Sequence, residues 1–170
     1  VSANEYRFRP TLFIGIGGLG ALALRQLRRR LVDRFDHLDR VPALEMLLLD
    51  TDVKALAHAS RADDPAAFKP RETISLPLRR CQDYREDSEK FLHWLSRRWL
   101  YNIPRSQQTE GMRPLGRLAL VDQADQVVGK IRQAVIAITD AAALAASRQT
   151  TGLEILDQFP RVVLVASISG

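Results

Sequence analysis

A glycine-rich turn is the part of this sequence whose residue types and spacing are best suited to chemistry. Residues 15–20 read Gly-Ile-Gly-Gly-Leu-Gly, between an apolar run and a long helix-forming stretch. Glycines let backbone N–H groups approach a phosphate, and a helix start presents further unpaired donors. Phosphate binding is therefore expected, with close helix–sheet packing as the alternative. The turn lacks the Lys-Ser/Thr ending of a P-loop, which argues against a lysine-clamped NTPase.

Two carboxylates follow a second apolar run at residues 44–49. Asp50 and Asp52 flank Thr51 there. In a dinucleotide-binding unit such an acid holds the ribose, but about 30 residues separate Gly20 from Asp50, against roughly 20 in that motif. A carboxylate beside phosphates can instead position Mg²⁺, which prefers oxygen ligands. Asp52 is the candidate for this role, and a simple helix cap is the alternative.

Alternating strand and helix patterns surround these residues. The apolar runs predict strands at 11–16, 44–49, 73–78 and 161–168. Residues 44–49 are nearly all apolar, which is typical of a central parallel strand buried on both faces. Helices are expected after the glycine turn from 20 to 41, at 53–59, at 87–101, and as two helices within 115–147 divided near 122–126. Residues 61–71 and 102–113 are expected to be loops.

This order of elements predicts a Rossmann-like, doubly wound α/β fold. About four parallel strands would form the sheet, with helices on both faces. Ligands bind such sheets at the carboxyl ends of the strands. Those ends carry residues 15–20, 50–52 and 167–170, so three polar or glycine-rich loops should converge on one edge.

The charge pattern favours no nucleic-acid partner. The net charge is +5, and arginines cluster at 25–30, 79–80 and 97–98. Neither interleaved aromatic residues nor zinc-finger spacing accompanies them. We expect these arginines to lie on solvated helix faces. The alternative is that they bind an acidic surface of a partner.

The remaining composition indicates a cytoplasmic protein without a structural metal. No apolar stretch is long enough to span a membrane, and the first ten residues lack the apolar middle of a signal peptide. Cys81 is the single cysteine, and the three histidines are scattered. A reducing compartment is therefore expected.

Four motifs in order resemble the tubulin/FtsZ superfamily, specifically its bacterial tubulin-like members. Residues 14–20 match the first phosphate loop, and 49–56 are similar to the stretch that ends the second strand of FtsZ. Residues 111–117, GMRPLGR, resemble the loop that contacts the terminal phosphate. Residues 162–170, VVLVASISG, look like the strand leading into the glycine-rich signature of the family.

The resemblance implies a nucleotide-binding domain over residues 1–170 that is incomplete at its C-terminus, with 79–110 as an insertion relative to FtsZ. It implies GTP or GDP as ligand, with Mg²⁺ near Asp52 and the terminal phosphate near Gly116 and Arg117. The implied nucleotide-binding residues are Gly15, Gly17, Gly18, Leu19, Gly20, Asp50, Thr51, Asp52, Gly116, Arg117, Ser169 and Gly170.

The resemblance also implies assembly into nucleotide-regulated filaments. A neighbouring subunit would supply the catalytic carboxylates, so GTPase activity is expected only in the assembled, full-length form, and no catalytic residue is identified in this chain. The rival interpretations are an ATP-dependent adenylating enzyme of the ubiquitin-activating type, an NAD-binding Rossmann domain, and a scaffold that binds no nucleotide. Within the insertion, Phe91, Trp94 and Trp99 are expected to be core contacts, with a partner-binding stripe as the alternative.

Overall fold

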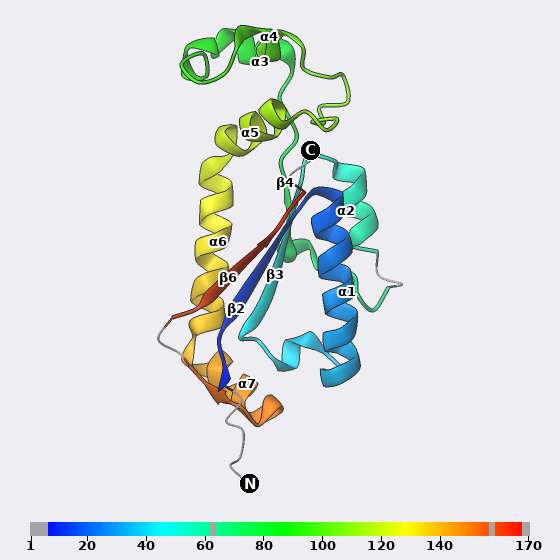
Figure 1. Cartoon of the computed structure of the whole chain (residues 1–170), viewed down its shortest axis with the longest axis vertical. Helices are drawn as coiled ribbons and strands as arrows, with labels where there is room; N and C mark the ends of the chain where they lie inside the picture. Colours follow the sequence, from blue (N-terminus) through cyan, green and yellow to red (C-terminus); the bar gives the residue numbers. More distant parts are fainter. Residues whose placement is uncertain (1–6, 62–63, 157–158, 168–170) are drawn as a thin grey trace.

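A parallel sheet in the order β4-β3-β2-β6 forms the centre of the molecule (Figure 1). The computed structural model describes residues 7–61, 64–156 and 159–167. The register runs from Thr11 opposite Leu44 on one side of β2 and from Thr11 opposite Arg161 on the other. The predicted α/β sheet of about four parallel strands is confirmed. Its strands are β2 (Thr11–Ile16), β3 (Leu44–Asp50), β4 (Thr73–Ser75) and β6 (Arg161–Val165).

Helices cover both faces of this sheet, as predicted. Figure 1 shows α1 (Gly17–Phe35) and α2 (Val53–Ala59) on one side and α6 (Ala124–Thr139) on the other. Side chains of β3 alternate between two cores, with Met46 and Leu48 facing Leu24 of α1. Leu47 and Leu49 belong to the core on the α6 side. The central position predicted for this strand is thus confirmed.

The helical stretch from 115 to 147 divides into three helices instead of two. They are α5 (Arg113–Asp122), α6 and α7 (Ala141–Thr151). The first break between helices, at Gln123, lies within residues 122–126, where a division was predicted. The second was not predicted: the Asp140 carboxylate accepts hydrogen bonds from Ala142 N and Ala143 N and so caps α7.

The helix predicted at 87–101 is wrong. The chain instead forms α3 (Cys81–Glu86), a 3₁₀ turn at Ser88–Lys90 and α4 (Arg97–Tyr101). Asp87 interrupts the helix because its carboxylate accepts from Arg79 at 2.9 Å, and Ser96 has an extended backbone. Phe91 is nevertheless buried, with Trp94 and Trp99 packed against the same core. The prediction of core contacts for these aromatic residues is confirmed.

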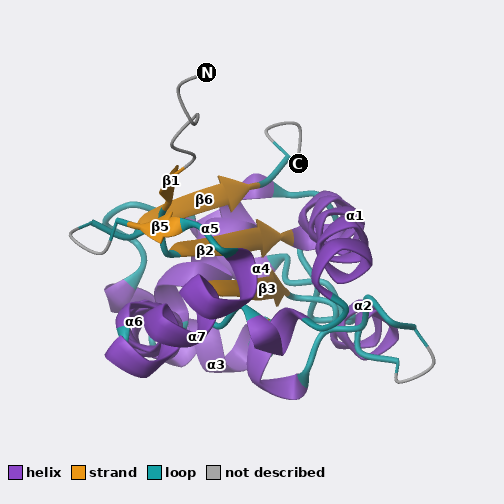
Figure 2. Ribbon diagram, turned by 90° about the horizontal axis from the view of Figure 1, so that it is seen from below, coloured by secondary structure: helices purple, strands orange, loops and turns teal. Residues whose placement is uncertain are grey.

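The last strand is less buried than predicted. β6 pairs with β2, and among the described residues no further strand lies beyond it. Figure 2 shows β6, β2 and β3 side by side in this order. Val162 and Leu164 are therefore 51% and 63% exposed. Residue 168, the predicted end of the strand, lies outside the described residues.

The arginine cluster on α1 is only partly solvated, which corrects the prediction from charge. Arg28 is 4% exposed, and its Nη2 donates to Glu72 Oε2 at 2.7 Å. Its guanidinium also lies over the Phe68 ring, 4.8 Å from the centroid. Arg25 and Arg29 both pair with Asp64. An acidic partner for the remaining basic residues stays a prediction.

Several short elements complete the described chain. 3₁₀ turns occupy Leu38–Arg40 and Pro70–Glu72. A second, two-stranded parallel sheet joins β1 (Arg7–Phe8) to β5 (Glu154–Ile155). No helix in the described part of the chain is long and apolar enough to cross a membrane.

Candidate functional site

The first and last glycines of the glycine turn allow α1 to start directly against β2. A Cβ atom at Gly20 would lie 2.7 Å from the carbonyl carbon of Gly15, and one at Gly15 would lie 2.9 Å from the Gly20 oxygen. Both clashes involve backbone, which has little room to move. Gly15 and Gly20 therefore fit the close-packing interpretation of the motif.

The two middle glycines have a different environment. Gly17 has φ of 68°, which a side chain disfavours, and a Cβ atom at Gly17 or Gly18 would have no neighbour within 4 Å. No side chain caps the start of α1, and its first turn holds no acidic residue. The first N–H groups of α1 thus keep their capacity to bind an anion.

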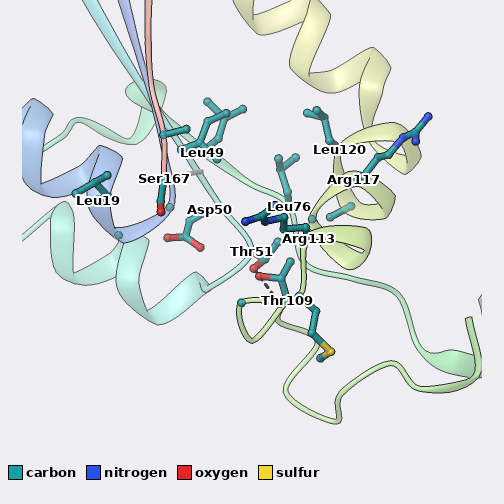
Figure 3. Close-up of a pocket in the computed structure, with 18 residues that line it drawn as sticks. Leu19, Leu49, Asp50, Thr51, Leu76, Thr109, Arg113, Arg117, Leu120 and Ser167 are labelled. Atoms are coloured by element: carbon teal, nitrogen blue, oxygen red, sulfur yellow. Dashed lines mark hydrogen bonds between the residues drawn. The ribbon is translucent and has the colours of Figure 1, made fainter. Parts of the chain in front are cut away.

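An open cavity of about 670 Å³ lies beside these glycines, within the range typical of small-molecule sites. Figure 3 shows its lining, which comes from Leu76 after β4 and from four longer segments. The longer segments are residues 16–19 of the glycine turn, 49–51 at the end of β3, 109–120 before and within α5, and 166–167 after β6. The convergence predicted for the carboxyl edge of the sheet is therefore present. Ser169 and Gly170, predicted to contribute, lie outside the described residues.

The residues that follow β3 divide between the cavity and α2. Asp50 and Thr51 line the cavity, and Thr51 Oγ1 accepts a hydrogen bond from Thr109 N at 3.4 Å. Asp52 does not line it. Its Oδ1 accepts from Lys54 N at 2.8 Å and Ala55 N at 3.2 Å, which caps α2. The geometry therefore supports the second of the two roles considered for Asp52, which is a helix cap.

The side chains that line the cavity suit Mg²⁺ only when a phosphate-bearing ligand supplies further oxygen atoms. Asp50 is the carboxylate that lines the cavity, and its Oδ1 accepts from Asp52 N at 3.0 Å. No group of three potential metal-binding side chains exists among the residues described. Because Mg²⁺ in nucleotide sites uses one or two carboxylates, phosphate oxygens and waters, Asp50 could hold it beside phosphates.

Two arginines of α5 line the opposite wall of the cavity. Arg117 was predicted to contact the terminal phosphate, and Gly116 beside it also lines the cavity. The Arg117 guanidinium lies 4.4 Å from the ring centroid of Trp94, and Figure 3 shows it pointing away from Asp50. Arg113 was not among the predicted residues, yet Figure 3 shows its side chain pointing into the cavity. The proline after it marks the start of α5 and is the signal that could have identified it.

The start of α5 adds to the positive potential of the cavity. Like α1, α5 has neither a side-chain cap nor an acidic residue in its first turn. Because helix N-termini carry a partial positive charge, both favour an anion between them.

The other end of α5 is attached to segment 79–110 by Asp122. Its two oxygens accept from Arg79 Nε and Nη2, both at 2.9 Å, and Oδ2 also accepts from the Tyr84 hydroxyl at 3.1 Å. Burial, aided by the charge of Asp122, raises the pKa of Tyr84 to about 12. Although burial alone would lower the pKa of Arg79, its hydrogen bonds to Asp87 and Asp122 raise it further above its ordinary value. The cluster therefore stays ionised at Arg79 and neutral at Tyr84 near pH 7.

Comparison with known proteins agrees with this geometry. A family model described as tubulin like matches residues 12–170. The matched range includes β2 from its second residue, the glycine turn, the end of β3 and all of α5. No curated protein and no solved structure gave a significant match. Since the family model covers most of the sequence, the chain belongs to the tubulin-like family.

Proposed function

We propose that this protein binds GTP or GDP with Mg²⁺ in the cavity at the carboxyl edge of the sheet. The observation that carries the proposal is the meeting of two uncapped helix starts, α1 at Gly17 and α5 at Arg113, on one cavity. Phosphates would bind at Gly17, Gly18 and Leu19, and Asp50 would hold Mg²⁺ or its waters. Gly116 and Arg117 remain proposed neighbours of the terminal phosphate. Guanine as the base rests on membership of the tubulin-like family.

We further propose that the nucleotide regulates self-association in the bacterial cytoplasm. Apolar side chains next to the glycine turn support this, because Leu19, Leu22 and Val53 are each more than half exposed. A second copy covering this surface would enclose the nucleotide. Hydrolysis would depend on carboxylates from that copy, in a GTPase that works only when assembled.

Nucleotide binding is tested on the full-length protein with labelled GTP, ATP and NAD in the presence of Mg²⁺. The variant Gly18→Val fills the open space at the start of α1, and Gly129→Val is its matched control in α6, where a Cβ atom also has no neighbour within 4 Å. We expect GTP-selective binding by the wild type and the control. Gly18→Val should bind GTP at least about tenfold more weakly, which corresponds to about 1.4 kcal/mol.

Other outcomes of this experiment separate the rival functions. ATP-selective binding lost in Gly18→Val would favour an adenylating enzyme, and NAD-selective binding would favour a dinucleotide-binding domain. If the wild type binds none of the three nucleotides, the proposed function is wrong.

Self-association is tested separately by sedimentation of the full-length protein with Mg²⁺ and either GTP or GDP. We expect more protein in the pellet with GTP. Leu22→Glu places a charge in the exposed apolar surface and should reduce pelleting without changing nucleotide affinity. Equal sedimentation with and without nucleotide would contradict nucleotide-regulated assembly.

A further inference from the structure

Two arginines on α5 line the same cavity with the same formal charge, but their surroundings differ. Arg113 is the first residue of α5, and Arg117 follows one turn later. Residues four apart lie on the same face of a helix, so both could reach a ligand in the cavity. Their side-chain contacts decide which one is free to do so.

Arg117 is engaged by the insertion. Its guanidinium stacks on Trp94 with 4.4 Å between the guanidinium carbon and the ring centroid. Trp94 is itself packed against the core, next to Phe91 with 6.3 Å between ring centroids. An aromatic face fixed in this way attracts and orients a cation. Arg117 would have to give up this contact to reach a phosphate near Asp50.

Arg113 has no such restraint. It forms no hydrogen bond or ion pair with another residue that the structure describes, and its side chain is exposed. Figure 3 shows it extending from α5 across the cavity toward Asp50. A guanidinium can donate two parallel hydrogen bonds to a phosphate, which makes it a specific partner for that group.

The position of Asp50 adds a reason for a cation at this point. Its carboxylate lines the cavity between the glycine turn and α5. A triphosphate and the Asp50 carboxylate together carry more negative charge than one Mg²⁺ ion neutralises, so a further positive group at this place would reduce the repulsion. The Arg113 side chain points toward this part of the cavity from α5, and the glycine turn lies on its other side.

We propose that Arg113 binds the outermost phosphate of the bound nucleotide and thereby makes the site prefer a triphosphate over a diphosphate. The inference rests on the proposed nucleotide function and deepens it. Phosphates that begin at Gly17 and Gly18 extend toward α5, and the third one meets Arg113. Arg117, proposed above as a neighbour of the terminal phosphate, is held by Trp94 and contributes little to this preference.

The test compares Arg113→Gln with Arg117→Gln in the full-length protein, using the dissociation constants of GTP and GDP with Mg²⁺. Arg113→Gln should weaken GTP binding at least about tenfold, as expected for the loss of charge-assisted hydrogen bonds, and GDP binding less than about threefold. Arg117→Gln should change either ligand less than about threefold. Arg113→Lys keeps the charge without the planar donor pair and should recover part of the GTP affinity. Thermal unfolding should be unchanged in Arg113→Gln.

An equal loss of GTP and GDP affinity in Arg113→Gln, or no loss, would overturn the inference. A larger GTP-selective loss in Arg117→Gln would overturn it as well. Binding of inorganic tripolyphosphate and pyrophosphate distinguishes a wrong role for Arg113 from a wrong proposed function. If the wild type binds tripolyphosphate but not GTP, the proposed guanine nucleotide is wrong, and the same pair of variants decides the role of Arg113 on these two probes. If the wild type binds no polyphosphate, both are wrong.

Discussion

The two walls of the cavity are built in different ways. The sheet wall consists of residues 15–20 with Asp50 and Thr51, and backbone contacts hold it in place. The helix wall consists of residues 109–120, and side chains from distant segments hold it. Asp122 binds Arg79, Arg117 stacks on Trp94, and Thr109 N donates to Thr51 Oγ1.

This difference indicates which wall can change without loss of the fold. Gly15 and Gly20 pack backbone against backbone, so no side-chain rotamer can relieve a displacement there. The sheet wall is therefore held in one arrangement. The helix wall depends on contacts with segment 79–110, made through Arg79 and Trp94. Movement of this segment would therefore act on the cavity through the helix wall.

The largest predicted effect comes from Gly20→Ala in the sheet wall. Its Cβ would lie 2.7 Å from Gly15 C and 3.0 Å from the Val165 oxygen. We expect a loss of about 3 kcal/mol in the free energy of unfolding, the upper range for overpacking. Urea denaturation measures it.

The matched control is Gly18→Ala, where the new methyl group has open space. Its unfolding free energy should stay within about 0.5 kcal/mol of the wild type. Equal stability of the two variants would show that the sheet wall is not held by glycine packing.

The next effect is predicted for Asp122→Ala in the helix wall. The variant leaves the Arg79 guanidinium and the Tyr84 hydroxyl without their shared acceptor. We expect a loss of about 2 kcal/mol in unfolding free energy, together with weaker GTP binding, because α5 loses its attachment to segment 79–110. Asp125→Ala, on the exposed first turn of α6, serves as the control. An Asp122→Ala variant as stable as this control would contradict the proposed basis of the helix wall.

A smaller effect separates the two carboxylates after β3. Asp52→Ala removes the cap of α2 and should cost about 1 kcal/mol of stability while leaving Mg²⁺-dependent GTP binding nearly unchanged. Asp50→Ala should give the reverse pattern, with weaker Mg²⁺ dependence of binding. Calorimetric titration with and without Mg²⁺ distinguishes them, and a larger binding defect in Asp52→Ala would restore Asp52 as the metal residue.

The last predicted effect concerns the helix wall and appears only at high pH. Burial raises the pKa of Tyr84 from 10.0 to about 12. A raised pKa in the folded state stabilises the fold below pH 10, and this stabilisation is lost as the pH rises toward about 12. Unfolding free energy should therefore fall less over this range in Tyr84→Phe than in the wild type. Parallel pH curves for the two proteins would contradict a neutral, buried Tyr84.

The sheet wall could be predicted from sequence because its signals are local. The apolar run at 11–16, the glycine turn and the helix at 53–59 have the bounds that periodicity and turn residues indicated. Two of these motifs, in order with residues 111–117 and 162–170, carried the resemblance to the tubulin-like family, and the family model confirms it. Local propensity and tertiary packing agree in this part of the chain.

The helix wall could not be predicted in the same way because its contacts are between distant residues. The helical pattern at 87–101 gave no indication that Asp87 would turn toward Arg79. The same reason applies outside the two walls, since Arg28 on α1 was expected to be solvated, yet Glu72, which lies 44 residues later, neutralises it in the core. Arg113 and Arg117 occupy one motif, and only the position of Trp94 distinguishes them.

Hydrogen exchange of the full-length protein, measured with and without GTP and Mg²⁺, tests the central claim that the nucleotide binds between both walls. Backbone amides at 17–20 and at 109–117 should both become protected when GTP is added, and those of β1 and β5, far from the cavity, should not change. Protection of one wall alone, or of neither, would contradict a nucleotide site built from the two.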